Sequence, residues 1–208
     1  MAPRQRTSGI TPLWSSMAAL NDTSKTLRRL YQRMFQRQED ARTREIVETL
    51  LQVPVFHDFP RSTLQDLADA IHTRRYKEDE FIYYERDPGL GMYVVQEGRV
   101  RLMTEDEAGA VHELRQASAN EIFGDISILG DFRRMETAQA VTEVRLLGFF
   151  RPDLKNMIKR NPRSGVEVMS ALARHTAARQ AELVRLVAES EGKVAAMRLL
   201  DGATLRAE

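Results

Sequence analysis

The middle of the chain is a series of short β-type segments, and this series limits the fold more than any other feature of the sequence. From residue 81 to residue 150, runs containing β-branched and aromatic residues alternate with turns that contain glycine and acidic residues. The runs are FIYYE (81–85), MYVVQE (92–97), RVRLM (99–103), VHELRQ (111–116) and TAQAVTEVRLLGFF (137–150). Several short strands at this spacing predict an antiparallel sandwich or barrel.

Helical periodicity flanks the β region on both sides. Apolar residues recur at the spacing of an amphipathic helix before and after it. The expected helices cover residues 21–38, 46–51, 61–75, 152–160 and 164–191. Gly192 follows the last of them, at a position where helices often end. We therefore expect an α+β protein, in which an antiparallel, jelly-roll-like β-roll is flanked by N-terminal helices and a long C-terminal helix.

The expected organisation has five parts. They are a flexible tail (1–20), a basic N-terminal helical segment (21–53), the β-roll (54–162), a long C-terminal helix (163–192) and a short tail (193–208). The first 44 residues hold nine basic and three acidic side chains, whereas the whole chain holds 31 and 30. The basic segment is thus either a docking helix with a solvated face, or an effector that binds an acidic partner, a membrane surface or nucleic acid without sequence preference.

The sequence contains no pattern typical of an enzyme or a metal site. The four histidines, at 57, 72, 112 and 175, lack the HxxxH and HExxH spacings of zinc sites. GxSxG, P-loop and GxGxxG patterns are also absent, and the chain has no cysteine. No run of about 18 apolar residues predicts a transmembrane segment. We expect a cytoplasmic protein without catalytic residues, metal or cofactor.

The segment FGDISILGDFRRMETAQA (123–140) combines groups that suit an anion. Gly124 precedes a short apolar helix, so that backbone N–H groups and the positive end of the helix can approach a phosphate. Arg134 can grip the same phosphate through charge-assisted hydrogen bonds, and Asp125 can accept a hydrogen bond from a ribose hydroxyl. The alternative is that Arg134 is a solvated charge at the start of a strand, and that Asp125 only caps the helix.

Residues 51 to about 190 resemble the cyclic nucleotide-binding domain family, which includes the catabolite activator protein, the regulatory subunits of cAMP-dependent kinase and nucleotide-gated channels. The matching runs are VPVFHDFP, LADAI, YKEDEFIYYERDPGLGMYVVQEGRVRLM, EIFGDISIL and RRMETAQAVTEVRLLGF. The resemblance implies an eight-stranded β-roll flanked by helices. It also implies a phosphate-binding cassette of the pattern Phe-Gly-Glu-Leu-Ala-Leu followed by Pro-Arg-Ala-Ala-Thr. In that cassette the helix and the Arg hold the cyclic phosphate, and the Glu binds the ribose hydroxyl.

The resemblance implies that the ligand-binding residues form one phosphate and ribose cassette. They are Phe123, Gly124, Asp125, Ile126, Ser127, Arg134, Met135 and Thr137. Asp125 replaces the family's Glu and shortens its reach by about 1.5 Å, and Arg133 replaces its Pro. Met135 stands where the family has a small residue beside the phosphate and can block a ligand. Glu136 replaces an Ala, and its carboxylate can neutralise Arg134.

Two further departures lie in the strand turns. Asp79 and Arg86 stand where the family usually has glycine. In the family, the helix after the roll moves over the bound base, so the segment 164–191 is the element expected to move. Arg174, His175 or Arg179 could cap a base, and the sequence does not select among them.

Two functions remain open. The first is a regulatory and signalling module that senses cAMP, cGMP or a related nucleotide and transmits through its terminal helices. The second is a degenerate scaffold that binds no nucleotide and serves protein interaction or dimerisation. We expect a homodimer formed through the terminal helices and a protein partner of unknown identity. Because residues 193–208 are too few for a helix-turn-helix domain, we expect no sequence-specific DNA binding.

Overall fold

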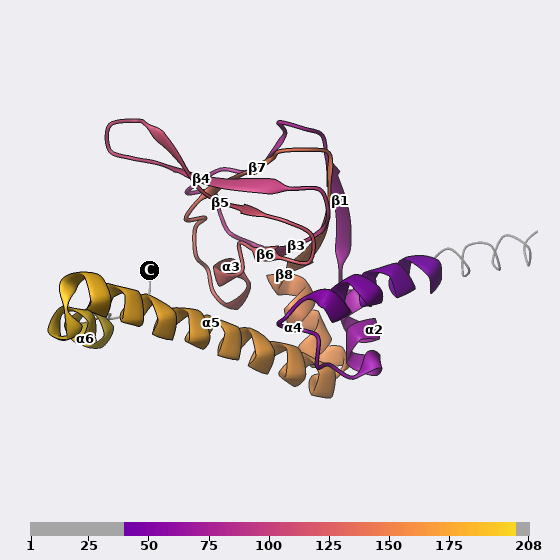
Figure 1. Ribbon diagram of the computed structural model, residues 1–208. Helices are drawn as coiled ribbons and strands as arrows, with labels where there is room; N and C mark the ends of the chain where they lie inside the picture. The colour runs from indigo at the N-terminus through magenta and orange to yellow at the C-terminus, as the bar shows by residue number, and fades with distance from the viewer. Residues whose placement is uncertain (1–39, 203–208) are drawn as a thin grey trace, which may run out of the picture. The chain divides into compact units, whose positions relative to one another are not determined.

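The computed structural model describes residues 40–202. The tail expected at 1–20 and most of the basic segment expected at 21–53 lie outside the described residues. The fold is α+β, as expected: eight strands form a β-roll, and helices precede and follow it (Figure 1).

The roll consists of two four-stranded sheets. The strands are β1 (His72–Tyr76), β2 (Phe81–Tyr83), β3 (Gly91–Glu97), β4 (Val100–Glu105), β5 (Val111–Ala117), β6 (Ile122–Phe123), β7 (Thr137–Ala140) and β8 (Val144–Phe150). One sheet has the order β1-β8-β3-β6 and the other the order β2-β7-β4-β5. Neighbouring strands are antiparallel in both sheets.

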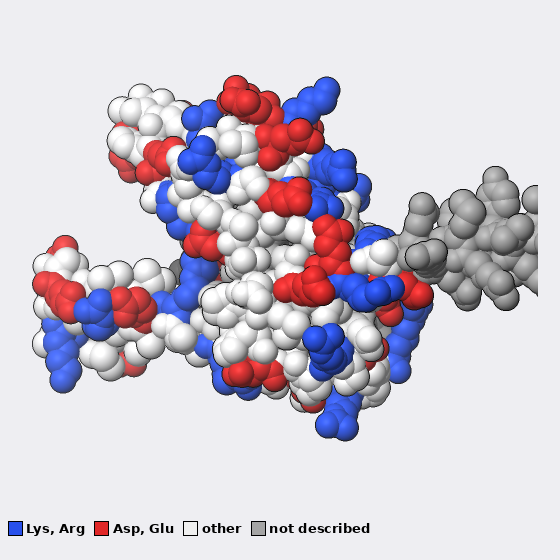
Figure 2. Space-filling model, turned by 45° about the vertical axis from the view of Figure 1, so that its right-hand side comes forward, with Lys and Arg blue, Asp and Glu red and all other residues white. Residues whose placement is uncertain are grey.

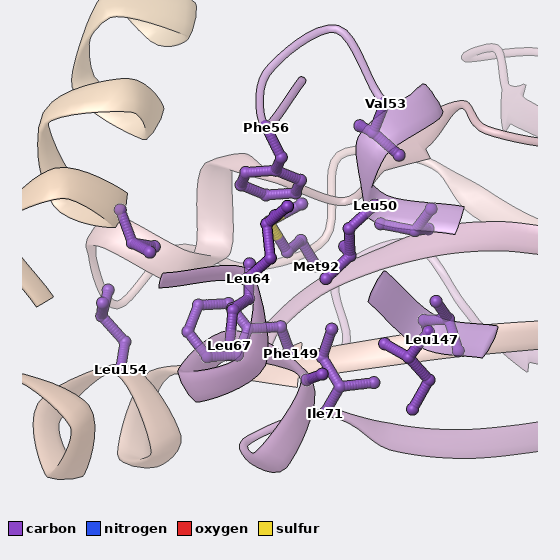
Figure 3. Packing of buried hydrophobic residues seen from close by; sticks show 14 of the residues in the cluster. Leu50, Val53, Phe56, Leu64, Leu67, Ile71, Met92, Leu147, Phe149 and Leu154 are labelled. Atoms are coloured by element: carbon purple, nitrogen blue, oxygen red, sulfur yellow. The ribbon is translucent and has the colours of Figure 1, made fainter. Parts of the chain in front are cut away.

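Strand β3 lies between two hydrophobic cores, because successive side chains of a strand point to opposite faces. Met92 and Val94 join a core shared with the helices, whereas Tyr93 and Val95 join the interior of the roll. Strand β8 alternates in the same way. Figure 3 shows the helical core, in which Met92 lies among side chains from the N-terminal helices and β8. Burial on both faces explains why these strands are apolar almost throughout.

Helices precede and follow the strands in the described part of the chain, and one short helix, α3, lies between β6 and β7. They are the helix at 40–52, α2 (Arg61–Asp69), α3 (Ile126–Leu129), α4 (Arg151–Arg160), α5 (Pro162–Glu191) and α6 (Lys193–Gly202). The start of α5 is set by Pro162 in its first turn and by Asn161, whose side chain accepts a hydrogen bond from the backbone N–H of Ser164. The end of α5 is set by Gly192 with φ of 89°.

Three expected boundaries were wrong. The helix expected over 61–75 ends at Asp69, because residues 72–76 pair with β8 as β1. The single strand expected over 137–150 is two strands, β7 and β8, which belong to different sheets. Residues 193–202, expected as part of a tail, form α6. This segment is rich in residues that favour helices, and its Ala196 is buried.

The turns at Asp79 and Arg86 keep the backbone conformation that favours glycine. Their φ angles are 64° and 67°, in the left-handed region. The turn at Arg86 also positions the cassette: the N–H of Arg86 donates to the carbonyl of Arg134, and the N–H of Arg134 donates to the carbonyl of Asp87. Arg86, the second of the two glycine replacements, therefore lies directly beside Arg134 of the candidate cassette.

Charged side chains are spread over the surface. In Figure 2, basic and acidic residues are interspersed on the visible face of the described part of the chain. This agrees with a formal net charge of +1 for the whole sequence. Recognition at a particular site must therefore come from local arrangements of charge, because the net charge supplies little attraction.

Candidate ligand-binding site

The candidate site lies where β6 turns into α3. Gly124, at this turn, has φ of 66°. A Cβ at this position would lie 2.4 Å from Nη1 of Arg134 and 3.2 Å from the hydroxyl of Tyr83. Glycine is needed here both for the backbone conformation and for the close approach of the arginine.

A cavity of about 240 Å³ opens beside this turn. Seven of the eight residues expected from the sequence line it: Phe123, Gly124, Asp125, Ile126, Ser127, Arg134 and Met135. Thr137 is not among them, and its hydroxyl accepts a hydrogen bond from the backbone N–H of Glu85. The lining also includes Leu102, Leu114, Arg115, Arg133, Glu136 and Arg179.

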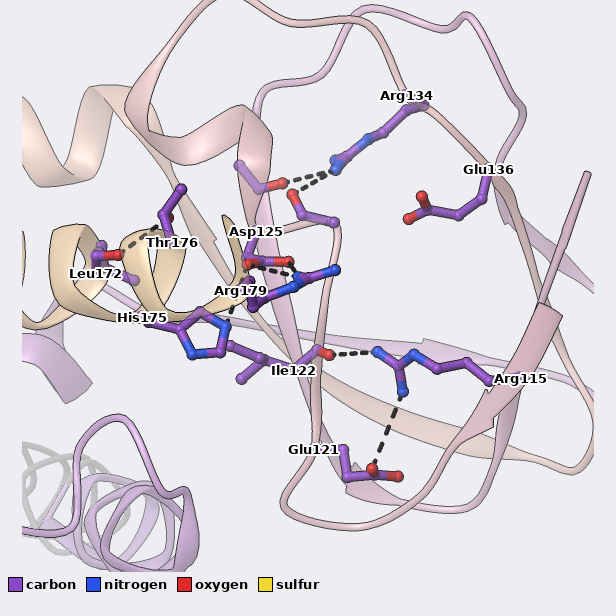
Figure 4. Close-up of polar contacts among 12 residues, drawn as sticks. Arg115, Glu121, Ile122, Asp125, Arg134, Glu136, Leu172, His175, Thr176 and Arg179 are labelled. Atoms are coloured by element: carbon purple, nitrogen blue, oxygen red, sulfur yellow. Dashed lines mark hydrogen bonds and ion pairs between the residues drawn. The ribbon is translucent and has the colours of Figure 1, made fainter. Parts of the chain in front are cut away.

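Arg134 is held in place within the roll. It is buried, and Nη1 donates to the carbonyl oxygens of Gly91 at 2.8 Å and Gly124 at 2.9 Å (Figure 4). Its guanidinium lies 4.1 Å from the centre of the Tyr83 ring, a cation–π contact. Its Nε is buried and has no hydrogen-bond partner among the described residues. A fixed cation with an unused buried donor beside a cavity is suited to an anion.

Asp125 is almost fully buried, and α5 supplies its partners. Nη1 of Arg179 donates to Oδ1 at 2.8 Å and to Oδ2 at 3.0 Å. Nε2 of His175 lies 3.3 Å from Oδ2, at ion-pair distance although without the alignment of a hydrogen bond. Figure 4 shows both side chains reaching from one face of the helix to Asp125. The carboxylate expected to bind a ribose hydroxyl is thus occupied by the protein itself.

Met135 and Glu136 do not lie as the sequence suggested. Met135 lines the cavity, but its side chain is 65% exposed, so it lies largely in solvent. Oε1 of Glu136 accepts a 2.8 Å hydrogen bond from the hydroxyl of Tyr83, and no ion pair joins Glu136 to Arg134 among the described residues. Burial and then the Glu136 charge raise the pKa of Tyr83, which keeps its hydroxyl protonated as the donor.

The structure separates the three residues proposed to cap a base. Arg179 lines the cavity and contacts Asp125. His175 contacts Asp125, and it also lines a second cavity, of about 660 Å³, beside the loop at 54–60. Arg174 lines only the second of these cavities. The spacing of four residues between His175 and Arg179 was the signal available in the sequence, since it places both on one helix face.

Arg115 of β5 was missed by sequence reasoning. Its Nη2 donates to the carbonyl of Ile122 at 2.9 Å, and the side chain lines the cavity. No local pattern in the sequence distinguishes Arg115, the one arginine of the exposed strand β5, from other exposed arginines of the chain. Only the β-roll, which brings β5 beside β6 and α3, identifies it.

The fold is a β-roll domain, and its cavity beside Gly124 is a candidate site for a small anion. Comparison with known families agrees: residues 73–161 match the model described as "Cyclic nucleotide-binding domain". Over these residues the chain is similar to that family.

The relatives that the chain matches include a receptor protein and a kinase regulatory subunit. The "Cyclic AMP receptor protein" of Thermus thermophilus is 34% identical over 131 residues, which are 62% of this chain and 59% of the relative. The "cAMP-dependent protein kinase regulatory subunit" of Emericella nidulans is 28% identical over 159 residues, 76% of this chain and 36% of the relative. The crystal structure of the Thermus thermophilus catabolite activator protein superposes with a TM-score of 0.54 at 30% identity, covering 64% of this chain and 62% of that one.

The similarity to these proteins is partial. The chain spans about 59% of the first of these relatives and 36% of the second. The similarity therefore covers the domain and not the complete proteins. Within residues 40–202, none of the helices has the length and apolar character that crossing a membrane requires.

Proposed function

We propose that this protein is a regulatory module that binds a cyclic mononucleotide, cAMP or cGMP, in the cavity beside Gly124 and signals through its terminal helices. The single observation that carries the proposal is Arg134: a buried arginine, fixed by two backbone carbonyls, lines the cavity with an unused buried donor. The names of the matched relatives, a cAMP receptor and a cAMP-dependent kinase regulatory subunit, support this ligand class.

The proposed roles follow from the position of each group. Arg134 and the backbone N–H groups at Ile126 and Ser127 hold the cyclic phosphate. Asp125 accepts a hydrogen bond from the ribose hydroxyl once Arg179 and His175 have moved away from its carboxylate. Phe123 and Met135 contribute apolar surface at the cavity. The module acts by binding alone, and we place it in the cytoplasm.

Titration calorimetry with cAMP and cGMP tests this function. Binding of either nucleotide is expected, with Arg134→Ala weakening it by about tenfold to hundredfold, because charge-assisted hydrogen bonds to phosphate are lost. Arg75→Ala, at an exposed position of β1 away from the cavity, is the matched control. Thermal unfolding of both variants shows whether each is folded. Absence of heat up to millimolar nucleotide would refute the proposal, and binding unaffected by Arg134→Ala would refute the site.

One observation favours the second function, a scaffold that binds no nucleotide. Asp125 already has two partners on α5, so the ribose acid is satisfied without a ligand. The calorimetry above separates the two functions, since a scaffold binds neither nucleotide.

We further propose that two copies associate through α5 and α6. Support comes from exposed apolar side chains near the end of α5 and on α6. They are Leu183, Leu186, Val194, Met197, Leu199 and Leu200. Light scattering after size-exclusion chromatography is expected to give a dimer that Leu186→Glu converts to a monomer. Leu90→Glu, at an exposed loop position, is the control and should leave the dimer intact. A wild-type monomer at all concentrations tested would contradict this association.

A further inference from the structure

We propose that Arg179 and His175 form a latch on Asp125, which fastens the second half of α5 to the cassette and which a bound cyclic nucleotide must open. The proposal rests on the proposed function, because it concerns the regulation of the same site. It goes beyond that function because it gives Arg179 a role in the ligand-free protein: Arg179 binds Asp125 there and competes with the ligand for it.

The contacts define the latch. Both oxygens of Asp125 are engaged by Nη1 of Arg179, at 2.8 and 3.0 Å, and His175 Nε2 lies 3.3 Å from Oδ2 (Figure 4). Asp125 is 5% exposed, whereas the Arg179 side chain is 52% exposed. The carboxylate is therefore the fixed half of the latch, and the arginine is the half that can leave into water.

The ligand and the latch use the same acceptor. A ribose hydroxyl at Asp125 needs the lone pairs on which the guanidinium now lies. A buried carboxylate is stabilised better by a cation than by a neutral hydroxyl. Replacing the Arg179 guanidinium by a ribose hydroxyl at Asp125 is therefore unfavourable by itself. The contacts of the phosphate with Arg134 must offset this cost in free energy. The apparent affinity of the site is therefore its intrinsic affinity multiplied by the fraction of molecules in which the latch is open.

The burial pattern of α5 shows what the latch controls. Its buried residues are Ser164, Gly165, Val168, Ala171 and Leu172, and none lies later in the helix. Pro162–Leu172 is thus anchored in the core, whereas the rest of α5 lies against solvent on most sides. In Figure 1, α5 passes beneath α3 before it reaches α6. The pair Arg179–Asp125 joins the unburied half to the cassette, so its opening frees that half together with α6.

The first test measures the position of α5 without any ligand. Because the chain has no native cysteine, Arg75→Cys and Ser190→Cys give one spin label on β1 and one near the end of α5. Dipolar distances are recorded on the full chain, diluted with unlabelled protein. Arg179→Gln is expected to broaden the distribution and shift its mean. Arg185→Gln, which removes only pairs with Glu182 and Glu189 on the same helix, should leave it unchanged. Equal distributions for Arg179→Gln and wild type would overturn the latch.

The second test measures nucleotide affinity by calorimetry. If the latch competes with the ligand, Arg179→Gln binds cAMP or cGMP about tenfold more tightly than wild type, the size expected for a partly exposed charged pair. Arg185→Gln should bind like wild type. Weaker binding by Arg179→Gln would show that Arg179 holds the ligand and would overturn the competition.

The two proposals can fail separately. If wild type and Arg179→Gln both bind no nucleotide, the proposed function fails, while the ligand-free distances still decide whether the latch exists. Asp125→Asn, which keeps hydrogen-bonding capacity but removes the charge, provides a second way to open the latch in case Arg179→Gln unfolds. Its distance distribution is expected to match that of Arg179→Gln, and a wild-type distribution would contradict the latch.

Discussion

The hydroxyl of Tyr83 donates a 2.8 Å hydrogen bond to the carboxylate of Glu136. The ring of the same tyrosine lies under the guanidinium of Arg134, 4.1 Å from its centre. Tyr83 thus contacts one acidic and one basic side chain of the cavity, and its hydrogen bond holds Glu136 away from Arg134. The candidate cassette retains a buried cation that lines the cavity, and the negative charge of Glu136 lies beside it.

Glu136→Gln is expected to strengthen cyclic nucleotide binding several-fold. The substitution removes a half-buried negative charge near the anion site, while the amide can still accept the hydrogen bond from Tyr83. Calorimetry at low and high salt measures the effect, which should shrink as salt increases. Glu107→Gln, in the exposed turn between β4 and β5, is the control. An unchanged affinity for Glu136→Gln would mean that its charge does not act on the ligand.

Gly124→Ala is expected to destabilise the fold by about 2–4 kcal/mol, from a left-handed φ and from a clash with Arg134. Gly109→Ala is a matched control, because Gly109 has φ of 83° and the nearest atom to a new Cβ is 3.4 Å away. Gly109→Ala should lower the free energy of unfolding only by the cost of backbone strain, about 1 kcal/mol. Urea unfolding measures both free energies. Equal losses would show that Arg134 moves aside without cost.

Stability is expected to fall as the pH rises above about 10. Burial raises the pKa of Tyr76 from its ordinary value of 10.0 to about 12, and it raises the pKa of Tyr83 as well. The unfolded chain then releases these protons at a lower pH than the folded protein does. The stabilisation is complete below pH 10 and is lost as the pH rises towards the folded values.

The variant Tyr83→Phe tests how much of this loss of stability at alkaline pH comes from Tyr83. Urea unfolding between pH 9 and pH 11 should give a shallower decline of the unfolding free energy for Tyr83→Phe than for wild type. Tyr84→Phe is the control, because Tyr84 is 53% exposed, and its decline should match wild type. Identical slopes for all three proteins would contradict the assignment to Tyr83.

Asp66→Ala is expected to lower the unfolding free energy by about 2–3 kcal/mol. The Asp66 carboxylate accepts hydrogen bonds from Asn161 Nδ2 and Ser164 Oγ, both at 2.6 Å, and so joins α2 to the start of α5. Its loss leaves two part-buried donors without this acceptor. Gln65→Ala, at an exposed position of α2, should change stability by less than about 0.5 kcal/mol. Equal effects of the two substitutions in urea unfolding would exclude a role for this junction.

Patterns of neighbouring residues predicted most of the fold. The apolar runs of β3 and β8 and the helix-forming segment of α5 are periodic, and turn residues mark their ends. Strand β1, with the sequence His-Thr-Arg-Arg-Tyr, was missed because it lacks apolar alternation and exists by pairing with β8. The two residues of β6 were missed for the same reason.

The candidate site was predictable only where its residues are close in sequence. Gly124, Asp125 and Arg134 lie within one segment, and the structure brings them to one cavity. The pair Asp125–Arg179 spans 54 residues of sequence, and it depends on the path of α5 beneath the roll. Neither the helix propensity of these residues nor their spacing in the sequence predicts the path of α5. The exposure of Met135 likewise depends on the direction that the backbone takes after Arg134, which the sequence pattern does not predict.

The unequal burial of α5 has a geometric consequence. Leu172 is the last buried residue of α5, and it is the pivot of the proposed opening. Arg179 lies about 10 Å beyond this pivot and Glu191 about 28 Å beyond it, at 1.5 Å per residue. A tilt that opens the Asp125 contact by about 2 Å therefore moves the far end of the helix by about 5 Å, nearly one helical turn. If the latch opens as proposed, the exchange of one hydrogen-bond partner at Asp125 thus moves the end of α5 that adjoins α6 by nearly one helical turn.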